Sequence, residues 1–429
     1  MSIAAQMEMV CGSSKGEPAT IGILESAAAM GGIQQTTLAL IRKLDRTRWN
    51  PIVICPEDGD LPNACRRSGV RVEILPLPPM LSTSFWIGRT KKVPNPVAWA
   101  WDTMAILAAA KVVADWLRAA RPKLIVTKGL LCHFYGALAA RYSGVPCLWY
   151  VQDLVSPRFG GVYQRLFGQG AKYLPTDIAA IGSQIVAQLP AALRGRARVL
   201  YNAVDVSTFG GVENRSRIRD ELGVPPGAFV IGQVARLTPW KGQHHLLEAF
   251  AKVAMARPSA HLMFVGGALF GGARYEAWLR QRVSQLGLDN RVTFAGHRRD
   301  VVDVLGALDL FAHCAVEKDI CNLSLLEAMA SRLPVVAFDI PGVRDAIVSG
   351  EEGMLVPAAE VEPLANEVVC LLDSPELRAR LGRAAREKVE RQFSLDRHVD
   401  VMEEILLHVL AARKLAHPAS ADQTVVLPN

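Results

Sequence analysis

Residues 229–243 read Phe229-Val-Ile-Gly-Gln-Val-Ala-Arg-Leu-Thr-Pro-Trp-Lys-Gly-Gln243. The first five form a short apolar run typical of a buried parallel strand, and the remainder is a loop that leads into a helical pattern. Strand, loop and helix alternate in the same way along both halves of the chain. This alternation is the signature of βαβ units, so we predict an α/β fold with two Rossmann-like, doubly wound parallel-sheet domains facing each other across a cleft.

The pattern breaks between Gly210 and Pro226, where Gly, Asn, Ser and Pro predict a hinge. The expected parts are an N-terminal domain over 1–210, a second domain over 211–393, an amphipathic helix over 394–415 and a flexible tail over 416–429. The expected strands are 20–23, 50–55, 71–75, 124–127, 147–151 and 177–181 in the first domain, and 229–233, 261–265, 292–295, 310–312, 334–338 and 354–356 in the second. Ligands bind at the carboxyl ends of the strands in such sheets.

Composition fits a globular protein, because 50% of the 429 residues are hydrophobic and 21% are charged. The most apolar long stretch, Val97 to Leu117, contains Asp102, Lys111 and Asp115. Charges are costly in hydrocarbon, so we predict a long buried helix here rather than a membrane span. Residues 1–15 lack the basic start and apolar centre of a secretory signal, so we expect a cytoplasmic protein. The eight scattered cysteines predict neither a disulfide nor a metal site.

Positive charge is concentrated in the first half. Up to residue 210 there are 23 Lys and Arg against 13 Asp and Glu, whereas the rest has 25 against 28. A basic half would suit an anionic acceptor or peripheral contact with an anionic membrane on its inner face. The alternative is charge spread over all faces for solubility. One basic-aromatic stretch could touch lipid or line an acceptor site, and it comprises Phe85, Trp86, Arg89, Lys91 and Lys92. No nucleic-acid partner is expected.

Arg236 and Lys241 lie five residues apart in the loop quoted above. Together with the N–H groups of the helix that follows, they could converge on a diphosphate. Negative charge grows on a departing nucleoside diphosphate, and two cations would stabilise it. The alternative is a solvated loop with two ordinary surface cations.

Two carboxylates occur eight residues apart in the stretch Asp319-Ile-Cys-Asn-Leu-Ser-Leu-Leu-Glu327. Asp319 precedes a helix and Glu327 lies near its start, so both could face the cleft and accept hydrogen bonds from sugar or ribose hydroxyls. The alternative is a capping box in which Ser324 caps the helix and Glu327 completes the box.

Paired glycines follow the first expected strand, at Gly31 and Gly32. Glycine lets the backbone approach a phosphate or sugar closely at the start of a helix. An ordinary turn between strand and helix is the alternative.

These stretches, with Val292-Thr-Phe-Ala-Gly-His-Arg-Arg-Asp300 and Gly353-Met-Leu-Val-Pro357, resemble the retaining nucleotide-sugar glycosyltransferases of family 4, the group 1 glycosyl transferases with the GT-B fold. The resemblance extends from about residue 20 to residue 410. It implies that Arg236 and Lys241 bind the donor diphosphate, that Glu327 binds the ribose, and that Asp319 sits at the donor sugar. It further implies donor contacts from Gly31, Gly32, Asn322 and Leu323, and from the base-binding segment that includes Gly296 and Arg298.

The chain departs from the family pattern at several of these positions. Asp319 replaces a glutamate and so retracts the carboxylate, Ile320-Cys-Asn322 replaces Gly-Phe-Gly, and Gln152 replaces a histidine. An amide can hydrogen-bond a sugar hydroxyl but cannot take up a proton. His133 is the remaining histidine candidate nearby, with a packed core histidine as the alternative. We therefore consider Asp319, His133 and Gln152 as catalytic candidates.

The resemblance implies no metal and no cofactor beyond the nucleotide-sugar itself, because Arg and Lys take the place of a cation. The expected reaction is a front-face displacement that retains anomeric configuration and moves a hexose from a nucleotide diphosphate, UDP rather than GDP, to a glycan, lipid-linked or small-molecule acceptor. The alternatives are a nucleotide-sugar epimerase on the same fold and a non-catalytic donor-binding subunit. Turnover of the donor in an assay that contains no acceptor would favour the epimerase.

Overall fold

The computed structural model describes residues 17–81, 84–87, 91–155, 158–210, 214–268, 272–317 and 319–416. The chain divides into two compact units, unit 1 (Met1–Leu200 with Val399–Asn429) and unit 2 (Tyr201–His398). The division after Leu200 lies ten residues before the boundary expected from the sequence. The predicted tail beyond Ala416 lies outside the described residues, as does Arg89 of the basic-aromatic stretch.

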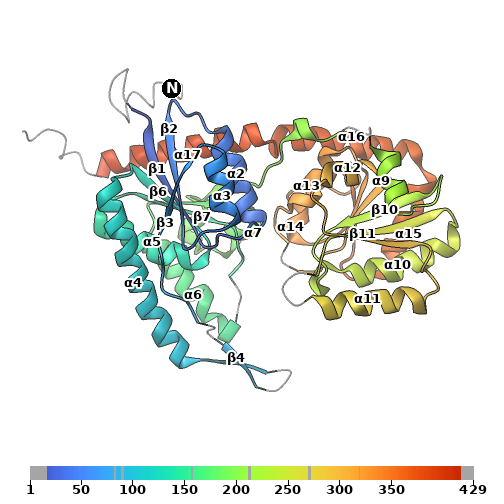
Figure 1. Ribbon diagram of the computed structural model, residues 1–429, viewed down its shortest axis with the longest axis horizontal. Coiled ribbons are helices and arrows are strands. Elements are labelled where there is room, and N and C mark those ends of the chain that lie inside the picture. Colours follow the sequence, from blue (N-terminus) through green and yellow to red (C-terminus); the bar gives the residue numbers. More distant parts are fainter. Residues whose placement is uncertain are drawn as a thin grey trace, which may run out of the picture. The chain divides into compact units, whose positions relative to one another are not determined.

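Unit 1 is built on one parallel sheet of seven strands in the order β3-β2-β1-β6-β7-β8-β9. Its strands are β1 (Ala19–Glu25), β2 (Trp49–Cys55), β3 (Arg71–Ile74), β6 (Leu124–Lys128), β7 (Cys147–Val151), β8 (Asp177–Ala180) and β9 (Arg198–Val199). Its helices are α2 (Gly32–Lys43), α3 (Asp60–Arg67), α4 (Pro96–Ala120), α5 (Leu130–Ser143), α6 (Arg158–Tyr173), α7 (Ser183–Gln188) and α8 (Ala191–Arg194). A hairpin of β4 (Ser84–Ile87) and β5 (Lys91–Pro94) precedes α4 (Figure 1).

Unit 2 repeats this plan with a six-stranded parallel sheet in the order β12-β11-β10-β13-β14-β15. Its strands are β10 (Phe229–Val234), β11 (Ala260–Val265), β12 (Val292–Gly296), β13 (Leu310–His313), β14 (Val335–Phe338) and β15 (Met354–Val356). Its helical elements are η1 (Val206–Thr208), α9 (Arg215–Glu221), η2 (Pro239–Lys241), α10 (Gln243–Ala256), α11 (Ala273–Gln285), α12 (Val301–Gly306), α13 (Leu323–Ala330), α14 (Pro341–Arg344), α15 (Val361–Asp373) and α16 (Pro375–Gln392). Two doubly wound parallel sheets confirm the predicted fold class.

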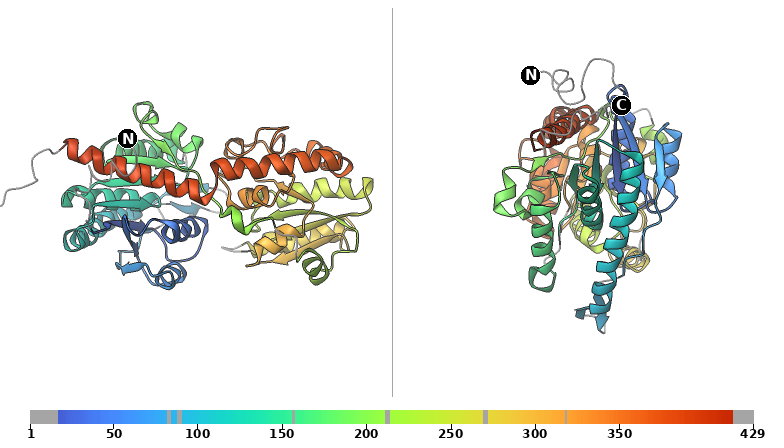
Figure 2. Two further views of the ribbon diagram at one scale, coloured as in Figure 1. Left: turned by 90° about the horizontal axis from the view of Figure 1, so that it is seen from above. Right: turned by 90° about the vertical axis from the view of Figure 1, so that its left-hand side faces the viewer.

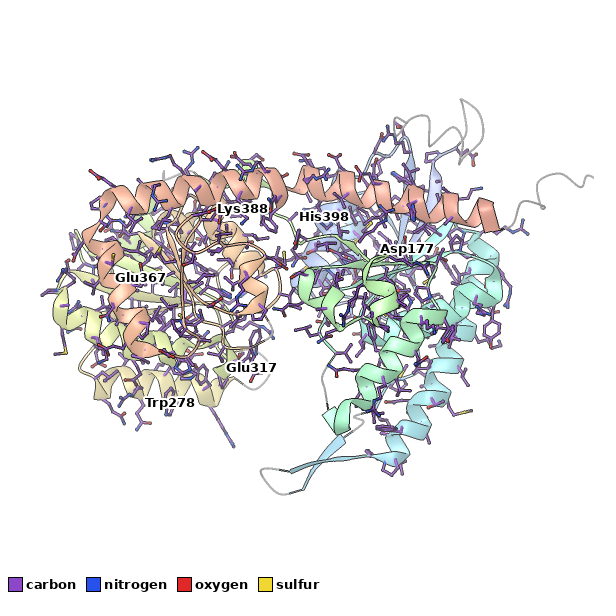
Figure 3. The ribbon with its side chains drawn as sticks, turned by 180° about the vertical axis from the view of Figure 1, so that it is seen from behind. Asp177, Trp278, Glu317, Glu367, Lys388 and His398 are labelled. Atoms are coloured by element: carbon purple, nitrogen blue, oxygen red, sulfur yellow. The ribbon has the colours of Figure 1, made fainter. Side chains whose placement is uncertain are left out.

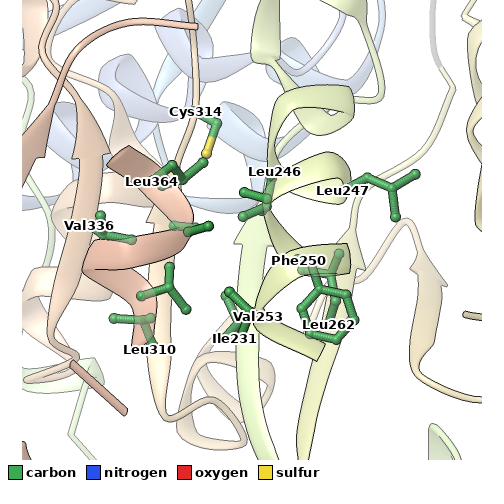
Figure 4. Close-up of a cluster of buried hydrophobic side chains, with 14 of the residues drawn as sticks. Ile231, Leu246, Leu247, Phe250, Val253, Leu262, Leu310, Cys314, Val336 and Leu364 are labelled. Atoms are coloured by element: carbon green, nitrogen blue, oxygen red, sulfur yellow. The ribbon is translucent and has the colours of Figure 1, made fainter. Parts of the chain in front are cut away.

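The central strands are buried along nearly their whole length because helices cover both faces of each sheet. All five residues of β6 and of β7 are buried, as are all six of β11. In unit 2, Ile231 and Leu310 from the sheet pack against Leu246 and Phe250 of α10 (Figure 4). Burying a side chain of this size stabilises the fold by about 1.5–3 kcal/mol. These interleaved apolar side chains hold α10 against the sheet and so fix where that helix begins.

The last helix, α17 (Leu395–Ala416), starts in unit 2 and continues in unit 1, and is drawn in red in Figure 2. Within unit 1, Glu403 of this helix accepts from Arg48 with 3.0 Å between Oε2 and Nη1. Met402 and Leu406 are buried beside β1 and β6. The amphipathic helix expected over 394–415 thus has one apolar face on the sheet of unit 1.

The long apolar stretch forms α4, which extends from the sheet of unit 1 towards the β4–β5 hairpin (Figures 1 and 2). Among the described residues it is the one helix long and apolar enough to cross a membrane, and 39% of its most apolar 18-residue window is buried. The predicted helix is confirmed, but the prediction that it is buried is only partly right. Its buried Asp102 accepts from the backbone N–H of Leu81 at 2.8 Å.

Candidate functional site

The strand order of each unit reverses at one point. In unit 1 the two strands at this point are β1 and β6, and in unit 2 they are β10 and β13. The connections that leave these strands diverge to opposite sides, which opens a crevice at their carboxyl ends where doubly wound sheets bind ligands. In both units, a lysine and a carboxylate lie together at this point.

In unit 2 the lysine is Lys241, at the end of η2, and only 6% of its surface is exposed. Its ammonium donates to Oδ2 of Asp319 and lies 4.4 Å from the centre of the Trp240 ring. Its backbone carbonyl accepts from Nε2 of the buried Gln233 at 2.7 Å. Burial lowers the pKa of Lys241, and the carboxylate of Asp319 acts in the opposite direction.

A glycine places this lysine. Gly242 has φ +69, a left-handed conformation, and a Cβ added to it would lie 1.8 Å from the carbonyl oxygen of Cys314. No other residue allows the start of α10 to approach the end of β13 so closely. The loop after β10 is therefore held against the loop after β13, which brings Lys241 to Asp319.

Several nitrogen atoms surround the carboxylate of Asp319. Besides Lys241, Nε2 of His313 lies 3.3 Å from Oδ2, and Nδ2 of Asn322 lies 3.0 Å from Oδ1 and 3.2 Å from Oδ2. Burial by itself would raise the pKa of Asp319, but the His313 ring and the charge of Lys241 outweigh it and hold this pKa well below its usual range. The carboxylate is therefore ionised at neutral pH.

Asn322 caps α13, and Leu323 is the first residue of that helix. The Asn322 side-chain oxygen accepts from the backbone N–H of Leu325 at 3.0 Å. The capping-box alternative, with Ser324 as the cap, is wrong, because Ser324 is the second residue of the helix and its hydroxyl donates to the carbonyl of Val234 at 2.7 Å. The cap thus belongs to the residue that also holds Asp319.

Glu327 is partly buried on α13, and burial raises its pKa to about 7. Arg236 lies exposed in the loop before Lys241, and its backbone carbonyl accepts from Nε2 of Gln243 at 2.8 Å. The charge of Arg236 is close enough to contribute to lowering the pKa of Lys241, after burial. The structure therefore brings Arg236, Lys241, Asp319 and Asn322 to one edge of the unit 2 sheet.

The proposed base-binding segment begins at Gly296, the last residue of β12, which has φ +66. The guanidinium of Arg298 binds Glu221 and lies 2.5 Å from Oδ2 of Asp300. The charge of Arg298 is therefore engaged within unit 2.

In unit 1, Gly31 is the N-cap of α2 and Gly32 is its first residue. Gly31 is extended at φ −135, and no side chain caps this helix. Ile33 is the second residue of α2, and its carbonyl accepts a hydrogen bond from the ammonium of Lys128 at 3.2 Å. The uncapped N–H groups of α2 are a ready position for an anion, as the paired glycines suggest.

Next to this helix start lies a buried polar network that the sequence motifs did not predict. Glu25 ends β1 and Lys128 ends β6, and they pair in register with 3.5 Å between Oε1 and Nζ. Gln34 donates to Glu25 at 3.2 Å, and Thr37 bonds both Glu25 and Lys128. All four side chains are at most 7% exposed. The sequence signal for this network is a charged residue at the carboxyl end of an otherwise apolar strand. It occurs in two strands that lie side by side in the sheet.

His133 and Gln152 are both buried in unit 1. The His133 ring stacks on Trp149 with 5.0 Å between centres, and its Nδ1 lies 2.8 Å from Oγ1 of Thr127. Burial lowers its pKa to about 3, so the ring is neutral at physiological pH. Gln152 follows β7, is 7% exposed, and both polar atoms of its amide lack a hydrogen-bond partner among the described residues. These surroundings favour a packed His133 and leave Gln152 able to bind a ligand hydroxyl.

Two family models match the chain. The glycosyl transferase 4-like domain matches residues 31–227, and the glycosyl transferases group 1 model matches residues 214–388. Together they extend over most of both units.

Two curated relatives are similar over part of their length. A GDP-mannose-dependent monoacylated alpha-(1-6)-phosphatidylinositol monomannoside mannosyltransferase of Corynebacterium glutamicum is 33% identical over 221 residues, which cover 49% of this chain and 55% of that protein. A D-inositol 3-phosphate glycosyltransferase of Corynebacterium efficiens is 33% identical over 205 residues, which cover 46% and 48%. The chain thus spans about half the length of the curated relatives it matches.

Solved structures match over both units. The Anabaena protein Alr3699/HepE in complex with UDP aligns over 90% of this chain and 99% of that one, with a TM-score of 0.76 and 25% identity. A glycosyltransferase of Rickettsia africae aligns over 92% and 99% with a TM-score of 0.76 at 18% identity, which shows the shared fold alone. The family models, the relatives and the two doubly wound sheets agree, and the chain belongs to the group 1 glycosyltransferases with the GT-B fold.

Proposed function

We propose that the chain is a retaining glycosyltransferase that moves a hexose from a nucleotide diphosphate donor, UDP rather than GDP, to a glycan, lipid-linked or small-molecule acceptor. The observation that carries this proposal is the convergence of Arg236, Lys241 and the start of α13 at the carboxyl ends of β10 and β13. The preference for UDP is supported by the Anabaena protein, whose structures contain UDP and UDP-glucose. The mannosyltransferase relative, named for GDP-mannose, keeps GDP as the alternative.

The chemistry follows from charge. As the bond between sugar and phosphate breaks, negative charge grows on the leaving diphosphate, and the cations of Arg236 and Lys241 stabilise it. Glu327 would accept hydrogen bonds from the ribose hydroxyls. The side-chain amide of Gln152 could donate a hydrogen bond to a sugar hydroxyl or accept one from it. In a front-face displacement the acceptor hydroxyl passes its proton to the leaving phosphate oxygen, so no protein nucleophile and no metal ion is required. This course retains the anomeric configuration.

Donor binding provides the direct test. In a thermal-shift screen against UDP-, GDP-, ADP- and CMP-sugars, one of these four classes of nucleotide-sugar should raise the melting temperature of the protein. A ligand that binds only the folded state stabilises that state. In calorimetry, Lys241→Ala should weaken binding of that donor by about tenfold or more, the cost of one charged hydrogen bond. The control is Lys252→Ala, an exposed lysine of the same unit that pairs with Glu362. Unchanged binding by Lys241→Ala would remove the diphosphate assignment.

We further propose that the protein is cytoplasmic and touches the anionic inner face of a membrane. Support comes from α4, whose exposed surface is apolar in its first half, at Val97, Trp101, Met104 and Leu107. The second half of the same surface carries Lys111, Asp115 and Arg118. Lys91 and Lys92 belong to β5, which precedes this helix in the chain, and no acidic residue occurs between Glu73 and Asp102. Exposed apolar side chains beside basic residues suit an anionic lipid surface.

Flotation with vesicles tests this contact. Trp101→Ser with Met104→Ser should abolish binding to vesicles that contain anionic lipid, whereas Lys111→Ala with Arg118→Ala, on the other half of α4, should reduce it slightly. Absence of wild-type binding would remove the proposal.

A non-catalytic donor-binding subunit is the second candidate, because Asp319 and Gln152 depart from the family pattern. An Asp319→Glu variant that binds nucleotide but transfers sugar to no acceptor would support it. Turnover of the donor in the absence of any acceptor would instead favour an epimerase.

A further inference from the structure

The carboxylate of Asp319 is buried among nitrogen atoms of unit 2. It contacts the ammonium of Lys241, the Nε2 atom of His313 at 3.3 Å, and the amide nitrogen of Asn322 at 3.0 and 3.2 Å. A carboxylate offers about four acceptor positions. With 7% of the residue exposed, a sugar hydroxyl has little room to reach either carboxylate oxygen while these three side chains stay in place.

None of the three neighbouring side chains is easily displaced. Asn322 cannot turn away without uncapping α13, because its oxygen accepts from the N–H of Leu325. His313 ends the buried strand β13 and is 4% exposed. Lys241 would lose its carboxylate partner in a site where 6% of its surface is exposed. A buried ammonium without a counter-charge is costly.

The backbone that carries Asp319 is held from both sides. A Cβ on Gly342 would lie 1.9 Å from the carbonyl oxygen of Asp319, so the start of α14 packs directly on this peptide. Two residues on, Cys321 adopts a left-handed φ of +45, and Nδ2 of Asn202 donates to its carbonyl at 2.8 Å. A strained conformation that neighbouring groups hold in place is typical of a functional site. The loop therefore does not present Asp319 to a ligand by simple side-chain rotation.

We propose that Asp319 is a positioning residue for Lys241 and does not bind the donor sugar. It fixes the ammonium at the carboxyl end of β10, and Asn322, in the place of a glycine, fixes the shortened carboxylate in turn. This inference rests on the proposed function, because it assumes that Lys241 binds the donor diphosphate. Asp319 then affects the nucleoside diphosphate and the nucleotide-sugar equally, since the diphosphate is common to both.

Calorimetry with UDP and UDP-glucose separates the two roles. Asp319→Asn keeps the size of the side chain but removes the counter-charge of Lys241, so both dissociation constants should rise by the same factor, about tenfold. In a Lys241→Met background the same substitution should change neither constant more than twofold. The control is Glu317→Gln, an exposed carboxylate in the same loop (Figure 3), which should leave both constants unchanged.

Contrary outcomes are equally definite. A rise for UDP-glucose more than threefold larger than that for UDP would show contact with the sugar and overturn the inference. So would unchanged dissociation constants, or an effect of Asp319→Asn that persists in the Lys241→Met background.

If Asp319→Asn does not fold, Asn322→Ala loosens the carboxylate while keeping both charges, and should again weaken the binding of both ligands equally. If the wild-type chain binds GDP and GDP-mannose instead, those are the probes. A wild-type chain that binds no nucleoside diphosphate would overturn the proposed function as well, which unequal shifts would not.

Discussion

Lys128 and Glu25 lie opposite each other across β6 and β1, at the same topological position in unit 1 that Lys241 and Asp319 occupy in unit 2. In unit 1 the carboxylate follows the first strand and the lysine the fourth, whereas in unit 2 this order is reversed. Each sheet therefore has a buried ion pair where its strand order reverses. Buried pairs of this kind add little net stability compared with apolar side chains, so their position suggests a role in orienting nearby groups.

We expect Lys128→Met to destabilise the protein by about 3–5 kcal/mol, because it leaves the Glu25 carboxylate buried without a partner. The double variant Glu25→Leu with Lys128→Met should recover most of this loss. Urea unfolding measures both. The matched control is the buried pair Glu352 and Lys388, 3.2 Å apart in unit 2 with Lys388 on α16 (Figure 3). If α2 is oriented by the pair in unit 1, only the unit 1 double variant should lose transfer activity while remaining folded.

Gly242→Ala should disrupt the donor site. The added methyl group would meet the carbonyl of Cys314 and push the loop that carries Lys241 away from β13. Gly287 serves as the control, because its φ of +67 matches the +69 of Gly242 but nothing lies within 4 Å of its added Cβ. Gly287→Ala should therefore cost about 1 kcal/mol, the backbone contribution alone. Equal losses of stability and donor affinity in the two variants would contradict the close contact.

Glu327 should make stability depend on pH. Its pKa is about 7 in the folded chain, above the value of 4.5 expected when unfolded, so the folded chain holds an extra proton between these values. Stability should then fall as pH rises from about 4.5 through 7, by about 1.4 kcal/mol for each unit of pKa difference before screening by solvent. Glu327→Gln should flatten this slope in urea unfolding at pH 5 and pH 8. A slope unchanged by the substitution would argue against the buried carboxyl.

His133 should act on stability in acid rather than on catalysis. Its pKa is about 3 when folded and 6.5 when unfolded, so the unfolded chain takes up a proton first as pH falls. Stability should be lost as pH drops below 6.5, and His133→Phe should remove part of that loss. His408 on α17, with half of its side chain exposed, is the control. Donor affinity at pH 7 should be the same in wild type and His133→Phe, and a large loss would restore a catalytic role.

All twelve strands expected from the sequence are present, most within one residue at either end, and the segments Cys147–Val151 and Met354–Val356 match at both ends. Parallel strands that are buried on both faces are nearly continuous apolar runs, and such runs can be recognised in the sequence alone. The two-residue strand β9 and the β4–β5 hairpin have no such run and were not predicted.

The candidate site divides in the same way. Arg236 and Lys241 could be predicted because cations in a loop that follows a strand can be recognised from the sequence alone. The partnership of Lys128 with Glu25 could not, because it depends on β6 lying beside β1 although some hundred residues separate them. The alternative that places the helix cap at Ser324 is wrong for a related reason. Asn322 and Ser324 are both good caps, and only the backbone of the loop decides between them.

The burial of Cys321 offers a way to observe this loop in solution. Cys321 is 2% exposed, and burial raises the pKa of its thiol. A thiol-alkylating reagent therefore cannot reach the sulfur, and little thiolate is present to react, in the folded loop. Cys370, exposed on α15, reacts regardless of the loop and calibrates the reagent. The labelling rate of Cys321 thus reports how often this loop opens, and a bound nucleotide that holds the loop in place would slow the labelling.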